Sequence, residues 1–279
     1  MKEAILKLLK TYPQRPYYTL RLQLQACRCN LYLNGIPIIS FYARGGVTTE
    51  VPLNNFILKS GRQQLQLTML PLDGEAVLNT YLDCSAEIGR REATNGRQLE
   101  NYQRINGFKI EEATKKEALP RFMKELPFVA EVPWDYSAAL AGAQNLPEGK
   151  ALEALVRNAV HNIHNLLEQR NTAKYQALVT PSIAKESNVL YRTPAEIEAL
   201  VEHADLSRGV NVLPVPPFHV QTYCNNKLVK AIRDTPDAWG NQSVLTYKVP
   251  PLSPGGKEGI ARQDWVYYLP AGARELQIY

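Results

Sequence analysis

The chain has 279 residues, of which 45% are hydrophobic and 21% are charged, and its formal net charge is +5. This composition is typical of a globular protein and excludes extensive disorder, and the length favours two domains. No segment approaches the run of about 20 apolar residues that a membrane helix needs. Lys and Glu residues interrupt the first ten positions, unlike the apolar region of a secretory signal. We therefore expect a soluble, cytoplasmic protein without a membrane span.

The first half of the chain alternates between apolar and polar residues, which predicts β-strands. In Tyr18–Leu33 the apolar set changes phase, from Leu20, Leu22 and Leu24 to Cys27, Cys29, Leu31 and Leu33. A one-residue shift of this kind predicts a β-bulge or a strand that changes sheets. Asn34-Gly35 predicts a hairpin turn, with Ile36–Tyr42 as the returning strand.

Further strands follow, separated by turns at Ser60-Gly61 and Asp73-Gly74. They are predicted over Val51–Leu58, Gln63–Leu70, Ala76–Ile88 and Phe128–Trp134. Several short alternating strands with regular turns predict an antiparallel β-sandwich domain over residues 1–136.

Part of this pattern resembles jelly-roll sandwiches of the carbohydrate-binding type. The resemblance rests on Leu31–Gly35 (LYLNG), Val51–Leu53 (VPL) and Leu58–Leu67 (LKSGRQQLQL), although Gln63 and Gln64 stand where those families usually have Asn. It implies a jelly-roll-like fold for the first domain. Because the pattern belongs to the scaffold, it implies no particular ligand.

Residues 89–124 carry much of the excess positive charge, with nine Lys or Arg residues and five Glu residues. A nucleic-acid site would interleave such a patch with aromatic residues, and few are present, among them Tyr102 and Phe108. We therefore expect a solvated, charged linker or helix surface here and no nucleic-acid partner.

The four cysteines, at positions 27, 29, 84 and 224, do not form a disulfide framework. Cys27 and Cys29 share one face of a predicted strand, so they are poorly placed to bond each other. No second Cys or His pair follows at the spacing of a thiolate metal site. We expect buried, reduced thiols and a reducing compartment.

Ser137–Lys150 is small, polar and contains Pro and Gly, which predicts a linker over residues 137–150. Helical periodicity follows it and predicts one amphipathic helix over residues 151–170 and a shorter one over Thr172–Val179. A third helix is expected to start at Thr193 and run to about His203, because Pro194 and Glu196 complete a capping-box pattern.

From Phe218 onwards the chain again predicts strands, which would form a meander: His219–Cys224, Lys227–Arg233, Ser243–Val249, Gln263–Leu269 and Arg274–Tyr279. Helices packed on an antiparallel meander sheet predict an α+β domain over residues 151–279. This element order, with the helix Leu152–Arg170 and Tyr175, resembles the cystatin-like cone of the nuclear-transport-factor-2-like and polyketide-cyclase-like superfamily. The resemblance implies a sheet that is covered by helices and encloses a pocket.

The first candidate site is His161-x-x-His164, with Glu168 a turn further along the same predicted helix. These spacings place the three side chains on one face, where they could present a metal. The alternative is an ordinary polar helix face, since Asn158, Asn162 and Asn165 surround them. We expect the polar face, and neither a metal nor a cofactor.

The second candidate site is the C-terminal sheet, where His219, Gln221 and Tyr223 share one strand face. Further residues that could line the same pocket are Trp239, Tyr247, Asp264, Trp265 and Tyr267. Aromatic side chains with a few polar groups are the usual lining of a ligand pocket, and the alternative is that they only pack beneath the helices. Asp264 is a possible carboxylate partner for His219 in catalysis.

Familiar catalytic signatures are missing from the sequence, which holds no Gly-x-Ser-x-Gly, no phosphate-binding Gly-rich loop and no His-Glu-x-x-His. The first functional hypothesis is therefore a non-enzymatic protein that binds a protein partner through polar strand faces rich in Gln, such as a bacterial accessory or toxin-neutralising protein. The alternative is a small-molecule-binding protein or an enzyme that uses the C-terminal pocket.

Overall fold

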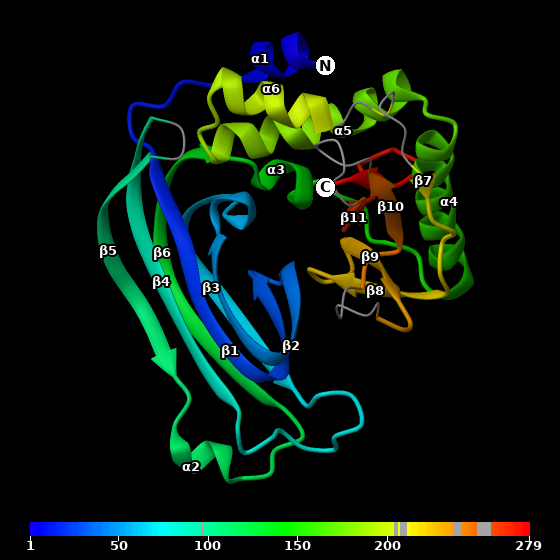
Figure 1. Cartoon of the computed structure of the whole chain (residues 1–279). Helices are drawn as coiled ribbons and strands as arrows, with labels where there is room; N and C mark the ends of the chain where they lie inside the picture. The colour runs from blue at the N-terminus through cyan, green and yellow to red at the C-terminus, as the bar shows by residue number, and fades with distance from the viewer. Residues whose placement is uncertain (96–97, 204–205, 207–210, 237–241, 250–257) are drawn as a thin grey trace.

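The computed structural model describes residues 1–95, 98–203, 206, 211–236, 242–249 and 258–279, which form mixed α and β structure (Figure 1). The helices are α1 (Lys2–Leu8), α2 (Glu112–Lys115), α3 (Ser137–Ala141), α4 (Gly149–Glu168), α5 (Thr172–Val189) and α6 (Pro194–His203), with the 3-10 helix η1 (Asn54–Phe56). The strands of the first half are β1 (Pro16–Leu33), β2 (Ile36–Pro52), β3 (Lys59–Leu70), β4 (Asp83–Asn95), β5 (Gln98–Lys109) and β6 (Phe122–Asp135). Those of the second half are β7 (Asn211–Val212), β8 (Phe218–Tyr223), β9 (Leu228–Arg233), β10 (Leu245–Val249), β11 (Gly259–Gln263), β12 (Tyr267–Tyr268) and β13 (Gln277–Ile278).

Strands β1 to β6 form one antiparallel sheet that curls into a half-barrel (Figure 1). The strand order is β5-β4-β1-β3-β6, and β2 also pairs with β1. The curl brings the two end strands together, since Asn106 Nδ2 in β5 donates a hydrogen bond to the Pro127 carbonyl oxygen in β6 at 2.8 Å. The antiparallel strands predicted for the first half are confirmed, but they form one curled sheet and not the two packed sheets of the predicted β-sandwich.

Strand β1 bends where its apolar residues change phase. The register against β2 shifts between Gln25 and Cys27, and Ala26 at the shift has a φ of 54°. The residues before the bend pair with β4, and those after it pair with β3. The bend therefore lets both apolar sets face the same core, and the predicted bulge is confirmed.

The Asn34-Gly35 hairpin is also confirmed, with both residues in the left-handed region at φ values of 53° and 81°. The strand expected over Val51–Leu58 is wrong beyond Pro52, because the fully buried Asn54 turns the chain into η1. Asn54 Oδ1 accepts from the Tyr18 backbone N–H at 2.8 Å, which fixes the turn.

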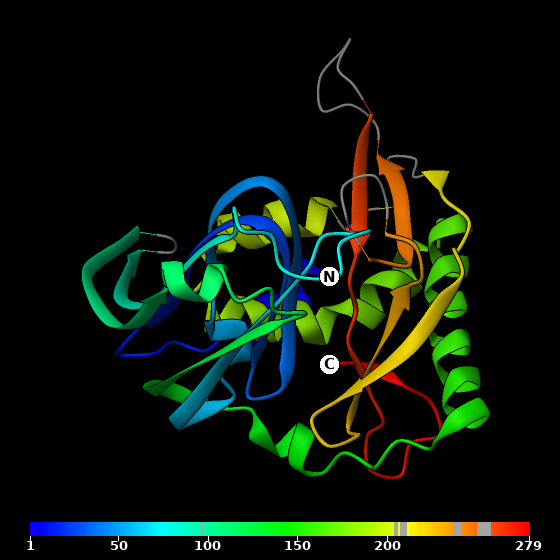
Figure 2. The same ribbon diagram turned by 90° about the horizontal axis from the view of Figure 1, so that it is seen from below.

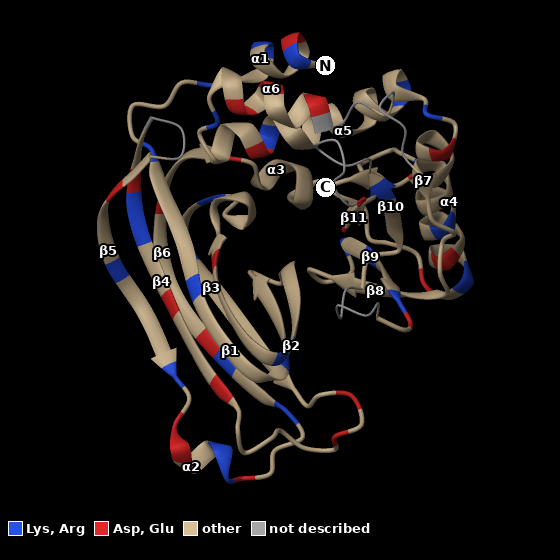
Figure 3. Ribbon diagram, viewed as in Figure 1, with Lys and Arg blue, Asp and Glu red and all other residues tan. Residues whose placement is uncertain are grey.

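The charged linker or helix expected over residues 89–124 is wrong, because most of this stretch belongs to β4 and β5. The charges within β4 and β5 lie on the outer face of an antiparallel pair, where solvent accepts them, and a short helix, α2, follows the pair. The guanidinium groups of Arg21 and Arg91 lie 4.2 and 5.0 Å from the ring centroid of Tyr102, whose hydroxyl bonds Glu87. Figure 3 shows positive and negative residues interspersed along β4 and β5.

The strand expected over Ala76–Ile88 begins later, at Asp83.

Helix α4 matches its prediction, and α6 begins with the predicted capping box. The Thr193 backbone N–H donates to Glu196 Oε2 at 2.8 Å, and the Glu196 N–H donates to Thr193 Oγ1 at 3.3 Å. Helix α5 is ten residues longer than expected, since it continues past Pro181 to Val189. Pro181 lies on the exposed side of the helix. The helix continues beyond it because the side chains of Ala184 and Val189 are again buried, and their packing stabilises the last turns.

The C-terminal strands form two sheets rather than the single meander that was predicted. One has the order β11-β10-β7 and the other has the order β13-β12-β9-β8. The difference arises because β10 pairs with β7, which precedes the β8–β9 hairpin, and not with β9. Helix α4 packs on both sheets, so the mixed α and β character of this half is confirmed (Figure 2).

The N-terminal helix α1 packs against α5 and α6, far along the sequence (Figure 1). Ile5 is fully buried against Ala184 and Ile197.

The predicted linker is bonded to the second half of the chain. The Gln144 backbone N–H donates to the Leu269 carbonyl oxygen, and the Leu146 N–H donates to that of Asn226, each at 2.9 Å. The domain boundary at residues 137–150 stays a prediction. None of the described helices is long and apolar enough to cross a membrane.

Candidate functional site

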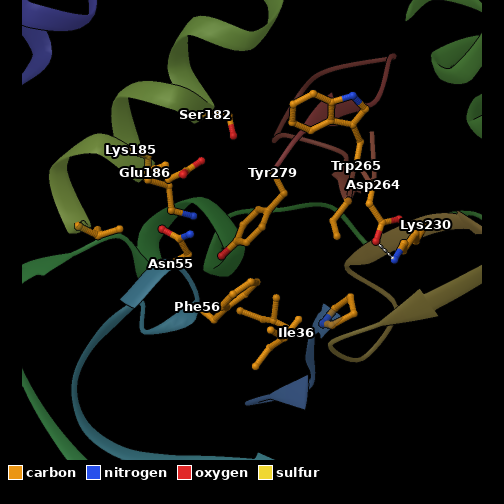
Figure 4. Close-up of a pocket in the computed structure, with 14 residues that line it drawn as sticks. Ile36, Asn55, Phe56, Ser182, Lys185, Glu186, Lys230, Asp264, Trp265 and Tyr279 are labelled. Atoms are coloured by element: carbon orange, nitrogen blue, oxygen red, sulfur yellow. Dashed lines mark hydrogen bonds and ion pairs between the residues drawn. The ribbon is translucent and has the colours of Figure 1, made fainter. Parts of the chain in front are cut away.

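A cavity of about 220 Å³ lies where the half-barrel, helix α5 and the C-terminal strands meet (Figure 4). The start of β2 and η1 form one wall, α5 forms the second, and the segment between β11 and β12 forms the third. The lining residues are Ile36, Pro37, Ile38, Asn55, Phe56, Ser182, Lys185, Glu186, Val189, Lys230, Asp264, Trp265, Val266 and Tyr279. The site therefore depends on segments from both halves of the chain.

Lys185 on α5 is a half-buried cation with no carboxylate within ion-pair distance among the described residues. Its neighbour Glu186 forms an ion pair with Arg192 instead. The Lys185 Nζ lies over the Tyr279 ring, 4.2 Å from the centroid, and 6.0 Å from the Tyr136 centroid. Burial lowers the pKa of Lys185 to about 8.

Two buried polar atoms in the same region have no hydrogen-bond partner within the described part of the chain. They are Asn55 Oδ1 and the Tyr279 hydroxyl. Figure 4 shows the side chains of Lys185, Asn55 and Tyr279 converging on one end of the cavity. Buried polar groups are nearly always paired, so an unsatisfied donor and acceptor beside a cation point to a polar ligand group there.

The opposite end of the cavity holds an ion pair and an indole ring. Lys230 Nζ lies 2.6 Å from Asp264 Oδ2, and the Lys230 side chain is 9% exposed whereas that of Asp264 is 41% exposed. The Trp265 Nε1–H donates to Gln263 Oε1 at 2.9 Å, and Gln263 Nε2 also bonds Tyr175 and Tyr247. This network fixes the Trp265 ring on the cavity wall.

His219, Gln221 and Tyr223 line a second, smaller cavity of about 90 Å³, which shares Pro37 and Lys230 with the first. The face that they share is turned toward the β1–β2 hairpin of the half-barrel. The helix α4 covers the opposite face, where Val220, Val229 and Ala231 are packed.

The carboxylate beside His219 is Asp234, whose Oδ1 lies 2.8 Å from His219 Nδ1. Asp264, the partner that the sequence suggested, is paired with Lys230 instead. Both members of the His219–Asp234 pair are largely exposed. The lining of the smaller cavity also includes the Ser40 hydroxyl and the Lys230 amine, of which Lys230 is paired with Asp264.

The remaining predicted residues are divided between the cavity wall and the core. Asp264 and Trp265 line the larger cavity, whereas Tyr247 and Tyr267 are buried in the core beneath α4. Trp239 lies outside the described residues. The structure thus divides the predicted site between two adjoining cavities and the core.

The His161-x-x-His164 motif lies on α4 with separate partners. His161 Nδ1 is 2.8 Å from the Arg157 carbonyl oxygen, and His164 Nε2 is 3.2 Å from that of Leu213. Within the described ranges, no group of three His, Cys, Asp or Glu side chains could hold a metal ion. Burial raises the pKa values of the core thiols Cys27, Cys29 and Cys84, which keeps them protonated.

The sequence did not identify Lys185, Asn55 and Tyr279 as site residues. Lys185 gives one recognisable indication, since it precedes the buried Val189 by four residues and therefore lies on the same helix face. That indication was missed because the helix was expected to end before Pro181.

Comparison of the chain with protein families, curated proteins and solved structures finds no match. The chemistry of the site is therefore the basis for inferring its function.

Proposed function

We propose that the protein binds a small organic molecule in the larger cavity, with an oxyanion or a carbonyl oxygen of the ligand at Lys185. The observation that carries this proposal is the half-buried Lys185 ammonium, which faces the cavity without a counter-ion among the described residues. A half-buried cation without an anionic partner is unfavourable, and an acceptor oxygen from a ligand would compensate it.

The other lining residues support a ligand with a compact ring as its body. Phe56, Trp265 and Tyr279 offer aromatic surface, and Ile36 and Val266 add aliphatic contacts. The volume of about 220 Å³ lies below the roughly 300–1,000 Å³ of pockets for drug-sized ligands. A single substituted ring suits this space, whereas a dinucleotide would exceed it.

The Lys230–Asp264 pair supports recognition of a second polar group at the far end of the ring. Lys230 is nearly buried and its charge is already balanced, whereas the partly exposed Asp264 keeps acceptor capacity. A hydroxyl or amino substituent that points away from Lys185 could donate to Asp264.

Ligand-induced stabilisation tests the proposal. Benzoate, phenylacetate and 4-hydroxybenzoate are titrated against the wild type, Lys185→Met and the matched control Lys174→Met, whose lysine is exposed on the same helix. We expect at least one compound to raise the melting temperature of the wild type and the control with increasing concentration, and to leave Lys185→Met unchanged. Equal shifts in all three proteins, or no shift in any, would contradict the proposal.

The other hypothesis drawn from the sequence, a non-enzymatic protein that binds a protein partner, stays a prediction, and a pull-down from the native host tests it. The jelly-roll and cystatin-like resemblances and the division into two domains also stay predictions. None of them is needed for the cavity, whose walls are defined by the contacts described above.

A further inference from the structure

We propose that Lys185 is a nucleophile that forms an imine with an aldehyde or ketone held in the larger cavity. This inference rests on the proposed function and names its substrate class, a small carbonyl compound with a ring body. It assigns to the lysine a covalent role beyond the binding of an acceptor oxygen.

The geometry supplies the first requirement, a half-buried amine in the wall of the cavity. Lys185 Nζ lies against the face of Tyr279 and is not held by an ion pair or a hydrogen bond within the described ranges. A lysine that is fixed to a carboxylate keeps its proton, whereas this amine is free to lose its proton.

The groups that face Lys185 from the neighbouring elements leave its charge uncompensated. On α5, the carboxylate of Glu186 is neutralised by Arg192. Tyr136, which follows β6, presents its ring to Lys185. Lys10, in the N-terminal segment, lies with its Nζ 5.8 Å from the centroid of the same ring. Among the described residues, no carboxylate lies within ion-pair distance of the amine to hold its proton.

The acid–base properties agree with this geometry. With a pKa of about 8, roughly a tenth of the Lys185 amine is neutral at pH 7, compared with well under a thousandth for a lysine at 10.5. Nucleophilic lysines in proteins are activated in this way, by desolvation in a hydrophobic pocket.

Tyr279 supplies the second requirement, a proton donor for the carbonyl oxygen. Burial is the main cause that raises the pKa of Tyr279 above its usual range, so the phenol keeps its proton. Its hydroxyl lacks an acceptor among the described residues and lies at the same end of the cavity as Lys185 (Figure 4). It could donate a hydrogen bond to the carbonyl oxygen and polarise the C=O bond.

The reaction is balanced without a further reactant. The neutral Nζ lone pair adds to the carbonyl carbon, the C=O π electrons move to oxygen, and one proton passes from nitrogen to that oxygen. The resulting carbinolamine loses the oxygen as water when the second N–H proton is transferred to it. The product is the C=N imine, and one water molecule is released for each imine formed.

Reductive trapping tests the proposal with benzaldehyde as the probe. The full chain is incubated at pH 7 with a limiting amount of benzaldehyde and sodium cyanoborohydride, which reduces an imine to a stable secondary amine. Peptide mass spectrometry then locates the benzyl group. We expect Lys185 to carry at least tenfold more label than the exposed Lys174 on the same helix, and excess benzoate to reduce that label.

Two variants make the outcome decisive. Lys185→Arg keeps the positive charge and cannot form this imine, so it should lose the preferential label. Lys174→Met should label at Lys185 like the wild type. Label spread evenly over exposed lysines, with benzoate binding intact, would overturn the imine and leave the proposed function standing. If the wild type shows neither selective labelling of Lys185 nor benzoate binding, the imine and the proposed function are both overturned.

Discussion

Asn54 and Lys185 are two polar side chains at the junction of the half-barrel with α5, and they differ in how they are accommodated. Asn54 is fully buried and uses its whole amide, since its Nδ2 donates to the Pro16 and Val189 carbonyl oxygens at 3.0 and 2.8 Å. Lys185 is partly buried without an equivalent set of partners. Asn54 therefore stabilises the junction, whereas Lys185 destabilises it in the absence of a ligand.

This difference gives a pH-dependent prediction for Lys185→Met. The pKa of Lys185 is lowered from 10.5 in the unfolded chain to about 8 in the folded protein, so the unfolded state binds more protons between these values. The lysine then costs about 1–3 kcal/mol of unfolding free energy below pH 8, and the cost fades as the pH rises toward 10.5. We expect Lys185→Met to be more stable than the wild type at pH 7 by that amount.

Urea denaturation at pH 7 and at pH 10 measures the difference between the two proteins, so that the titration of other groups cancels. The advantage of Lys185→Met should shrink at pH 10. Lys174→Met serves as the control and should show no comparable change. A difference that is the same at both pH values would mean that packing of the methionine, and not the lysine charge, is responsible.

At the scale of elements, the short helix α1 is the least expected part of the fold. Its seven residues are too few to be stable in isolation, so its packing on α5 and α6 must hold it. Asn188 on α5 accepts from the Lys10 backbone N–H at 2.6 Å and donates to the Leu8 carbonyl oxygen at 3.0 Å. Together with the burial of Ile5, these bonds fix the N-terminal segment onto the helical layer.

We therefore predict that Ile5→Ala lowers the free energy of unfolding by about 2–4 kcal/mol, because it removes a fully buried side chain and leaves a cavity. Chemical denaturation followed by circular dichroism measures the change. Leu8→Ala is the matched control on the same helix, where the side chain is 51% exposed, and it should change stability by less than about 0.5 kcal/mol. Equal effects of the two substitutions would show that α1 is not docked as described.

Elements were predictable from the sequence wherever a local rule decides the structure. The bulge at Ala26, the Asn34-Gly35 turn and the capping box at Thr193 each follow from backbone chemistry within a few residues. The strand β5 was missed because charged residues on the solvent face of a sheet weaken the alternation that marks a strand. The pairing of β10 with β7 depends on contacts distant in sequence, which periodicity does not report.

The site was predictable only in part for the same reason. The shared face of His219, Gln221 and Tyr223 follows from strand alternation, and the structure places all three in one cavity wall. Lys185, Asn55 and Tyr279 come from α5, η1 and the last described residue of the chain, and no spacing rule connects them. Their juxtaposition results from how the two halves dock.

At the scale of the whole molecule, a mixed cluster of aromatic and aliphatic side chains joins the open end of the half-barrel to α5. It contains Tyr12, Tyr17, Ala93, Trp134, Val189, Leu190 and Tyr191. The Tyr191 hydroxyl donates to the Pro16 carbonyl oxygen at 3.1 Å, next to the bond that Asn54 makes to the same oxygen. The half-barrel and the helical layer therefore share buried hydrogen bonds and apolar contacts that neither could form alone.

Because of these shared contacts, we predict that the whole chain unfolds in one cooperative transition, and that Asn54→Ala shifts it as a unit. Removal of the Asn54 side chain leaves the Tyr18 N–H and the Val189 carbonyl oxygen buried without their partner, which should lower the free energy of unfolding by about 2–4 kcal/mol. Urea denaturation followed by tryptophan fluorescence and by far-UV circular dichroism should give coincident curves in the wild type and in the variant. Asn158→Ala, at an exposed position of α4, should leave the midpoint within about 0.5 kcal/mol of the wild type. Two separated transitions, of which Asn54→Ala moves only one, would instead mean that the half-barrel and the C-terminal half are independent, and that the cavity between them opens without unfolding either.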